Sequence, residues 1–146
     1  MVKIRLVRSE DIAQVYKIES EAFKYPYPRT LLEYYSNLKD AVFYVAEVDN
    51  SIVGYVIGLL RRRIIGHIIS IAVSKRYMRR GIGSKLLKKA EETLRRMGAK
   101  VLRLEVRNSN IPAINFYVKH GYKIAFIKEY YYPNGESAYV MYKVFF

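Results

Sequence analysis

Residues 78–84, which read MRRGIGS, have the composition of a turn that binds phosphate. They follow a β-branched apolar run at 67–73 and precede apolar residues at helical spacing over 82–97. Gly81 and Gly83 therefore fall where a strand gives way to a helix N-terminus, whose free N–H groups and dipole bind phosphate oxygens. The arginines at 79 and 80 add positive charge at the same place. On local sequence alone, a tight turn with a solvated basic rim is an equal alternative.

Glu105 is the carboxylate best placed for acid–base chemistry. Alternation along an expected strand at 100–107 puts it on one face with Val101, Arg103 and Arg107. Beside a phosphate-binding turn, such a carboxylate can act as a base. The alternative, which the local residues favour, is a strand carboxylate held in salt bridges by the two arginines.

His67 lies on the strand expected at 67–74, which leads to the turn at 78–84. Alternation places it on the side of Ile69, Ile71 and Val73. A lone histidine in that position is more often structural than catalytic.

Several other polar side chains have both a chemical and a structural interpretation. Asn110 precedes an expected helix at 111–119 and is typical of an N-cap. Tyr117 lies late in that helix, where core packing is the default explanation. Four tyrosines fall in expected loops, where a core explains the rings less readily: Tyr25, Tyr27, Tyr131 and Tyr132.

The elements that must position these residues mix strands and helices along the chain. Strands are expected at 2–7, 42–48, 52–60, 67–74, 100–107, 121–128 and 137–145. Helices are expected at 9–22, capped by Ser9, and at 30–38, 82–97 and 111–119. The sequence DNS at 49–51 indicates a hairpin, and Gly98 ends the long helix. Because no repeat, linker or low-complexity tract interrupts this pattern, we expect one α+β domain over residues 1–146.

Composition limits the classes of function. Apolar residues make up 51% of the chain, yet no apolar run reaches the length of a membrane span, so we expect no membrane partner. The chain has no cysteine, which excludes disulfides, thiolate metal sites and cysteine nucleophiles. The first residues alternate like a strand rather than a signal peptide, and we expect a cytoplasmic protein. The net charge of +13 predicts attraction to polyanions, among them nucleic acid, ribosomes, acidic lipid and a phosphate-rich cofactor.

Two blocks of the chain resemble the GNAT superfamily of acetyl-CoA-dependent N-acetyltransferases. The first is MRRGIG at 78–83, which lines up with the family's pyrophosphate loop, Gln/Arg-x-x-Gly-x-Gly/Ala. Met78 replaces the usual polar first residue, a small change because the loop works mainly through backbone N–H groups. The second block, EVRNSNIPAINFY at 105–117, is similar to the family's strand–helix element. It matches especially the branch that acetylates protein N-termini, in ribosomal-protein and archaeal acetyltransferases.

This resemblance implies a mixed, mostly antiparallel sheet with splayed central strands and helices on both faces. It implies acetyl-CoA as acetyl donor in the gap between those strands and a peptide entering from the other side. The implied reaction is transfer of an acetyl group to the N-terminal α-amine of a protein, by direct attack in a ternary complex and without a metal. The implied partners are protein or peptide N-termini, together with the ribosome.

The resemblance also implies a role for each matched residue. Glu105 would be the base, through water, with His67 as helper or substrate contact, and Tyr117 would protonate the departing thiolate. The implied acetyl-CoA contacts are Ile71, Ala72 and Val73 for the pantetheine arm, Arg79, Arg80, Gly81, Ile82, Gly83 and Ser84 for the pyrophosphate, and also Asn110 and Tyr117. The implied walls of the peptide site are Tyr27, Tyr131 and Tyr132, beside His67 and Glu105.

Two rival functions fit parts of the sequence. One is a GNAT enzyme that acetylates a lysine side chain or a small amine. The other is a basic nucleic-acid-binding protein, in which arginines and loop tyrosines contact phosphates and bases. The second leaves both matched blocks unexplained, so nucleic acid is not expected as a substrate.

Overall fold

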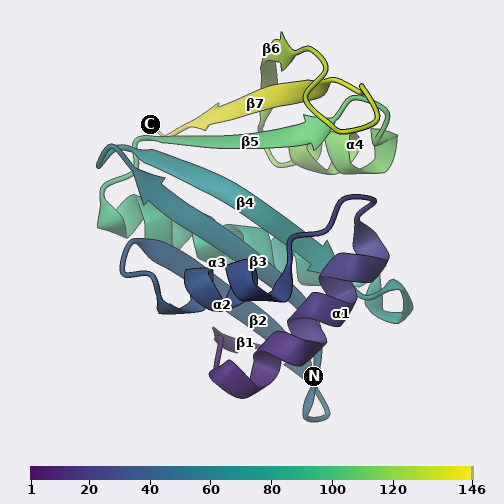
Figure 1. The fold of residues 1–146 in the computed structure, drawn as a ribbon. Helices are drawn as coiled ribbons and strands as arrows, with labels where there is room; N and C mark the ends of the chain where they lie inside the picture. Colours follow the sequence, from purple (N-terminus) through teal and green to yellow (C-terminus); the bar gives the residue numbers. More distant parts are fainter. Residues whose placement is uncertain (146) are drawn as a thin grey trace.

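Over residues 1–145, which the computed structural model describes, seven strands form one mixed sheet (Figure 1). The strands are β1 Lys3–Leu6, β2 Ala41–Val48, β3 Ser51–Arg61, β4 Ile65–Val73, β5 Val101–Arg107, β6 Lys123–Lys128 and β7 Ala138–Val144. Their order across the sheet is β1-β2-β3-β4-β5-β7-β6. Every neighbouring pair is antiparallel except β4 with β5, which confirms the mostly antiparallel sheet.

The two central strands separate after a short parallel contact. Residues 65–67 of β4 pair with residues 101–103 of β5, and the pairing stops there. Both strands continue, β4 to Val73 and β5 to Arg107, so a gap opens toward their carboxyl ends. This confirms the splayed centre of the sheet.

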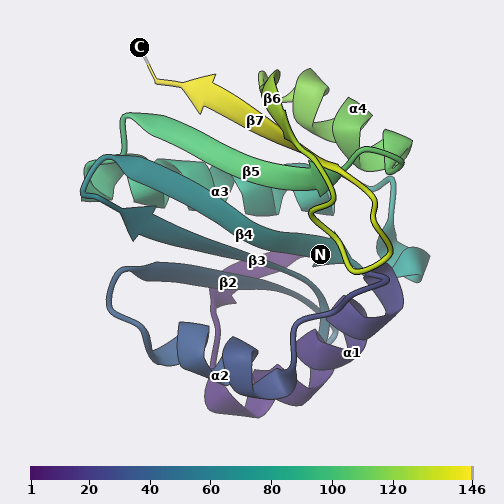
Figure 2. The same cartoon turned by 45° about the horizontal axis from the view of Figure 1, so that its top comes forward.

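Helices cover both faces of the sheet (Figures 1 and 2). On one face, α1 (Ile12–Ala22) and α2 (Arg29–Asn37) bury a core with Tyr55 and Ile57 of β3. On the other, α3 (Ile82–Met97) and α4 (Ile111–Lys119) share a core with Leu102 and Leu104 of β5. The gap between β4 and β5 therefore connects two faces that are covered by different helices.

One sequence expectation is wrong because β4 contains a bulge. The register of β4 against β3 skips Ile69. Beyond it, Ser70 bonds Glu19 of α1, whereas Ile71 and Val73 pack with the α3 core. Simple alternation places residues 67, 69, 71 and 73 on one side of the sheet. The extra residue in the bulge instead turns the side chains of residues 71 and 73 to the opposite side.

The start of the first helix also differs from expectation. Ser9 does not cap it; a 3₁₀ turn over Ser9–Asp11 precedes α1, and the Asp11 carboxylate accepts the Arg8 N–H at 2.7 Å. Asp11 also pairs with Arg5 of β1 at 2.8 Å, which ties the turn to the sheet edge. The other element ends lie within about two residues of those expected, and Gly98 ends α3 with φ of +119°.

No helix within residues 1–145 is long and apolar enough to span a membrane.

Candidate active site

Glu105 lies where β5 leaves β4, on the sheet face opposite α3. Its Oε1 is 2.7 Å from His67 Nε2, and its Oε2 accepts the Arg103 Nε–H at 2.9 Å. Burial raises the pKa of the Glu105 carboxyl, but the bonds from His67 and then Arg103 outweigh it and lower the pKa to about 2. The side chain is therefore ionised at neutral pH. Of the two arginines that the local sequence suggested as partners, Arg103 pairs with Glu105, whereas Arg107 pairs with Glu136.

His67 belongs to the same cluster. It faces Arg103 in the last paired position before the gap, and its side chain is 12% exposed. Because an ionised carboxylate only accepts, Nε2 carries the proton that bonds Glu105, which leaves the lone pair of a neutral ring at Nδ1. Nδ1 is buried and has no hydrogen-bond partner within residues 1–145. An atom in that state costs about 1–3 kcal/mol unless water or a ligand reaches it.

Tyr117 lies on α4, on the opposite side of the sheet from Glu105. Its ring packs edge-on against Phe116, with centroids 5.4 Å apart, and against Tyr122 at 5.7 Å. Burial, and to a smaller extent the neighbouring Tyr132, raises the pKa of the Tyr117 hydroxyl well above its usual range. The hydroxyl is thus protonated at neutral pH, so this core residue is also available as a proton donor.

The turn at 78–84 has the backbone that the glycine pattern predicted. Gly81 takes φ of +79° as the N-cap of α3, and a side chain there would meet no atom within 4 Å. Glycine is therefore required by the backbone conformation rather than by crowding. At Gly83 an added Cβ would lie 3.5 Å from the Phe116 ring, because α4 packs on the start of α3. Arg79 and Arg80 are exposed beside this helix end.

The strand edge that leads to this turn is available for a ligand. Beyond His67, the edge of β4 that faces β5 has no strand partner within the described chain, and this stretch includes Ile71, Ala72 and Val73. Asn110 caps α4, since its Oδ1 accepts the Ala113 N–H at 3.3 Å. The capping interpretation of Asn110 is thus correct, and its amide NH₂ remains free to meet a ligand.

The loop tyrosines come together from two distant segments. Tyr25, in the loop after α1, stacks on Tyr132, in the loop after β6, with centroids 6.3 Å apart and planes 13° apart. Tyr131 packs edge-on against Tyr132 at 5.0 Å. Burial, and then neighbouring charges that include Glu105, raise the pKa of Tyr27 well above its usual range. The two loops therefore meet beside the Glu105 cluster.

Glu19 is a buried carboxylate that was not among the residues singled out from the sequence. It is 1% exposed and accepts the Tyr27 N–H at 3.0 Å, the Ser70 hydroxyl at 2.8 Å, and the Tyr55 hydroxyl. It thereby links the loop after α1 to β3 and β4. The available signal was an acidic residue on the apolar face of a helix, where a carboxylate is found only when it is bonded.

Glu136 plays a corresponding part in the other loop. Its carboxylate accepts bonds from Asn134 at 3.0 Å, Ser109 at 2.7 Å and Arg107 at 3.0 Å, and these lower its pKa to about 2. The loop that carries Tyr131 is thereby fastened to the end of β5. Within residues 1–145, no group of three or more histidine, cysteine or carboxylate side chains is arranged to hold a metal ion.

Residues 12–122 match the acetyltransferase (GNAT) family. The chain is 41% identical to an uncharacterized N-acetyltransferase of Methanocaldococcus jannaschii, over 96% of this chain and 90% of that protein. It is 37% identical to an N-alpha-acetyltransferase of Sulfurisphaera tokodaii, over 95% of this chain and 90% of that protein. The crystal structure of Ard1 from Thermoplasma volcanium superposes with a TM-score of 0.93 at 31% identity, over 99% of this chain and 98% of that one.

Proposed function

Because the chain belongs to the acetyltransferase (GNAT) family, we propose that it transfers an acetyl group from acetyl-CoA to the α-amine at a protein N-terminus. The observation that carries this proposal is the His67–Glu105 pair, 2.7 Å apart where β4 and β5 diverge. Similarity to an N-alpha-acetyltransferase over nearly the whole chain supports the choice of acceptor.

The residues along the gap suit acetyl-CoA. The Gly81 turn and the first N–H groups of α3 would hold the pyrophosphate, with Arg79 and Arg80 beside them. The unpaired edge of β4 would hold the pantetheine arm, which is an extended chain of amides and therefore pairs like a strand. When bound there, acetyl-CoA supplies the acetyl group as a reactive thioester.

His67 and Glu105 would together remove a proton from the attacking amine. An α-amine has a pKa of about 7.7–8.0, so most of it is protonated at neutral pH. Both oxygens of the Glu105 carboxylate are already held by bonds from His67 and Arg103, so it would not take this proton directly. It instead fixes the His67 ring through the Nε2–H bond, which leaves Nδ1 to accept the amine's proton through water.

Tyr117 would return a proton on the other side of the gap. Its neutral hydroxyl can donate to a departing thiolate, whose own pKa is roughly 8.5 if it equals that of a cysteine thiol. Base and acid thus lie on opposite faces of the sheet, so amine and leaving group need not compete for one residue. No covalent enzyme intermediate is needed, and the transfer is direct.

The acceptor assignment follows from proton equilibria and from the loops. The reference pKa values of an α-amine and a lysine differ by about 2.5, which corresponds to roughly 3.5 kcal/mol that a lysine-directed site must supply. A single His–Glu pair suits the α-amine, which is the easier of the two amines to deprotonate. The stacked Tyr25 and Tyr132 join the two loops beside the His67–Glu105 pair. With Tyr27 and Tyr131, they would form an entrance wide enough for the end of a peptide chain only.

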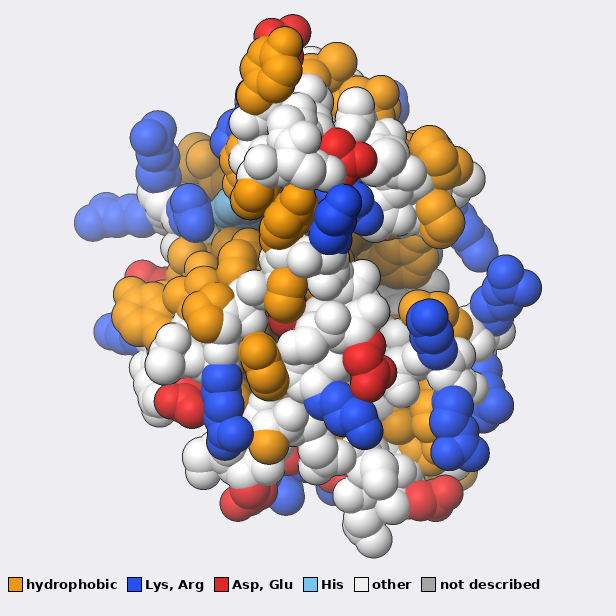
Figure 3. Space-filling model, turned by 45° about the vertical axis from the view of Figure 1, so that its right-hand side comes forward, with side chains coloured by type: hydrophobic (Ala, Val, Ile, Leu, Met, Phe, Trp, Pro, Cys, Tyr) orange, Lys and Arg blue, Asp and Glu red, His pale blue; other side chains and the backbone are white. Residues whose placement is uncertain are grey.

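The charge of the molecule fits a partner at the ribosome. Lysine and arginine side chains stand out over much of the face drawn in Figure 3, and acidic side chains are fewer there. A net charge of +13 favours encounter with ribosomal RNA, near which new N-termini emerge.

The proposed function is tested with acetyl-CoA and a panel of peptides that differ in their first residue. Mass spectrometry of the products locates each acetyl group, and N-terminally blocked versions of the same peptides are the control. Acetylation at the N-terminus of at least one peptide, with none on its blocked version, is the expected result. A panel with no N-terminal acetylation would reject the proposal.

A further inference from the structure

The sheet face that carries His67 and Glu105 is covered by helices over only part of its width. Helices α1 and α2 lie over β2, β3 and β4 (Figure 1). Within residues 1–145, the core beneath these helices includes no side chain of β5, β6 or β7. On that open part of the face, the Arg103 guanidinium lies 5.8 Å from the ring centroids of both Phe126 and Tyr142, and Phe126 is 44% exposed. The surface next to Glu105 is therefore open toward β7 and β6.

Three cationic side chains from different strands gather around Tyr131, one of the rings proposed to line the peptide entrance. Lys128, in the last position of β6, places its Nζ 5.1 Å from the centre of the Tyr131 ring. Burial and then Glu105 raise the pKa of the Tyr131 hydroxyl, and the charges of Arg103 and Arg61 oppose that rise. Arg103 of β5 and Arg61, at the end of β3, therefore lie near the same ring.

Strand pairing places Arg61 on the sheet face of His67. Residues directly opposite one another in paired strands point to the same side, and so do residues two apart in one strand. Leu59 of β3 lies opposite His67, and Arg61 follows two residues later. Arg61 is therefore on the His67 side of the sheet, about 7 Å along β3 from the position opposite His67.

Strand pairing also places Lys128 on the sheet face of Glu105. Lys128 pairs with Ala138 of β7, and Ala138 pairs in turn with Arg107 of β5. Arg107 lies two residues beyond Glu105 in the same strand, so its side chain points to the same side. Lys128 and Arg61 thus approach Tyr131 from two edges of one open face.

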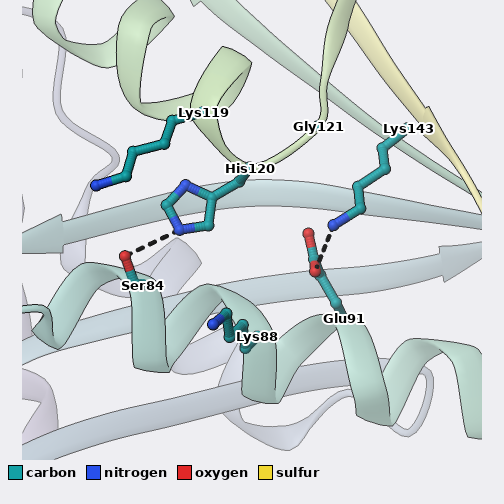
Figure 4. A pocket seen from close by; sticks show the side chains of 7 residues that line it. All are labelled: Ser84, Lys88, Glu91, Lys119, His120, Gly121 and Lys143. Carbon is teal, nitrogen blue, oxygen red and sulfur yellow. Dashed lines mark hydrogen bonds and ion pairs between the residues drawn. The ribbon is translucent and has the colours of Figure 1, made fainter.

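Arg61 and Lys128 carry charges that no carboxylate neutralises. Neither forms an ion pair with any residue in 1–145. Arg103, in contrast, is paired with the site carboxylate at 2.9 Å. On the opposite face of the sheet, Lys143 of β7 is likewise neutralised, because it pairs with Glu91 of α3 at 3.0 Å (Figure 4). We refer to Arg61 and Lys128 as the entrance cations.

We propose that the entrance cations select acceptor peptides that carry an acidic side chain at their third residue. This rests on the proposed transfer to a protein N-terminus, because the first residue must then lie at the His67–Glu105 pair. An extended chain advances about 3.3 Å per residue, so its third residue lies about 7 Å from the first. The same spacing separates Arg61 from the position opposite His67. The first and third residues of an extended chain also point to the same side, so a carboxylate on the third would meet the free charges.

The test measures kcat/KM for three peptides that differ only at the third residue, which is glutamate, glutamine or arginine. Each has a free N-terminus and no other charged side chain. Unaltered protein should acetylate the glutamate peptide about fivefold more efficiently than the glutamine peptide, the effect of two partly exposed charged contacts. The arginine peptide should be the poorest of the three. The differences should appear in KM rather than kcat, because the contacts lie away from the reacting atoms.

Paired variants locate the source of this preference. In Arg61→Gln/Lys128→Gln the preference for glutamate over glutamine should fall below about twofold. In Arg61→Glu/Lys128→Glu the arginine peptide should become the best of the three, because the charge of the entrance is reversed. The matched control, Arg96→Gln/Lys100→Gln, removes the same charge from exposed positions in α3 and just after it, and should keep the full preference.

A fourth peptide separates local contact from general attraction by the net charge of +13. It carries glutamine at the third residue and its only glutamate at the eighth, about 23 Å from the first residue in an extended chain. Because salt screens exposed charges beyond about 8 Å, this glutamate should change the efficiency less than about twofold.

Equal efficiencies of the unaltered protein for the glutamate and glutamine peptides would overturn this proposal and leave the proposed function intact. A preference that survives in Arg61→Gln/Lys128→Gln would also overturn it, as would an equal loss in the control or an equal effect of glutamate at the eighth residue. Absence of N-terminal acetylation on every peptide would reject the proposed function instead. The ratio between two peptides on one protein does not depend on the folded fraction, so a less stable variant still gives a valid result.

Discussion

Replacing Glu105 by glutamine removes the negative charge that holds His67 and Arg103 but keeps the size of the side chain. In the native protein, burial raises the pKa of this carboxyl, and the bonds from His67 and Arg103 overcome burial and lower the pKa from 4.5 to about 2. A carboxyl with a depressed pKa stabilises the fold while it is ionised. Its contribution is therefore present above pH 4.5 and is lost as the pH falls through about 2.

The size of this contribution follows from the same two values. A change from 4.5 to about 2 corresponds to about 3 kcal/mol of unfolding free energy in full. Between pH 5.5 and pH 3, about 2 kcal/mol of it should be lost, because at pH 3 the unfolded carboxyl is mostly protonated and the folded one is not. Glu105→Gln lacks the titrating carboxyl, so its unfolding free energy should not contain this pH-dependent contribution.

The assay is urea unfolding of both proteins at pH 5.5, 4.2 and 3. The difference between their unfolding free energies should shrink by about 2 kcal/mol over this range, since all other titrating groups are shared. Glu33→Gln is a matched control, because its ion pair with Arg29 is half exposed and contributes little. A difference that stays constant within about 0.5 kcal/mol would refute the reasoning about Glu105.

Three further substitutions test separate parts of the site. Gly81→Val should weaken coenzyme A binding in calorimetry at least about tenfold, because a β-branched residue does not tolerate φ of +79°; an unchanged Kd in the folded variant would contradict this. Tyr117→Phe should lower kcat about tenfold or more by removing the proton donor, with the Kd of coenzyme A unchanged, whereas wild-type turnover would exclude that role. Glu19→Gln should raise the KM for peptide several-fold more than that for acetyl-CoA, because it loosens the loop at Tyr27. Equal increases in both KM values would mean a general loss of structure instead.

Much of the fold could be predicted from local signals. The ranges 82–97 and 111–119 agree with α3 and α4 to the residue, because Gly98 and Asn110 mark helix ends through backbone chemistry of their own. The bulge at Ile69 left no such signal, since its neighbours are apolar and β-branched on both sides. Bulges are fixed by strand pairing, which alternation in one strand does not encode.

The site was less predictable, because it depends on which strands are neighbours. His67 and Glu105 are 38 residues apart, and only the parallel contact of β4 with β5 brings them together. Local sequence placed Glu105 between two arginines, but Arg107 turns to Glu136 of a distant loop. Glu19 could have been found, because a carboxylate on an apolar helix face needs buried partners, although the sequence does not say which.

The proposed acceptor is an α-amine rather than a lysine side chain. Its most direct test is kcat/KM for two matched peptides, one with a free N-terminus and no lysine, the other N-terminally blocked with one internal lysine. We expect efficient acetylation of the first peptide and acetylation of the second slower by about two orders of magnitude, because fewer than about one lysine in a thousand is neutral at pH 7. Faster acetylation of the blocked peptide would contradict it.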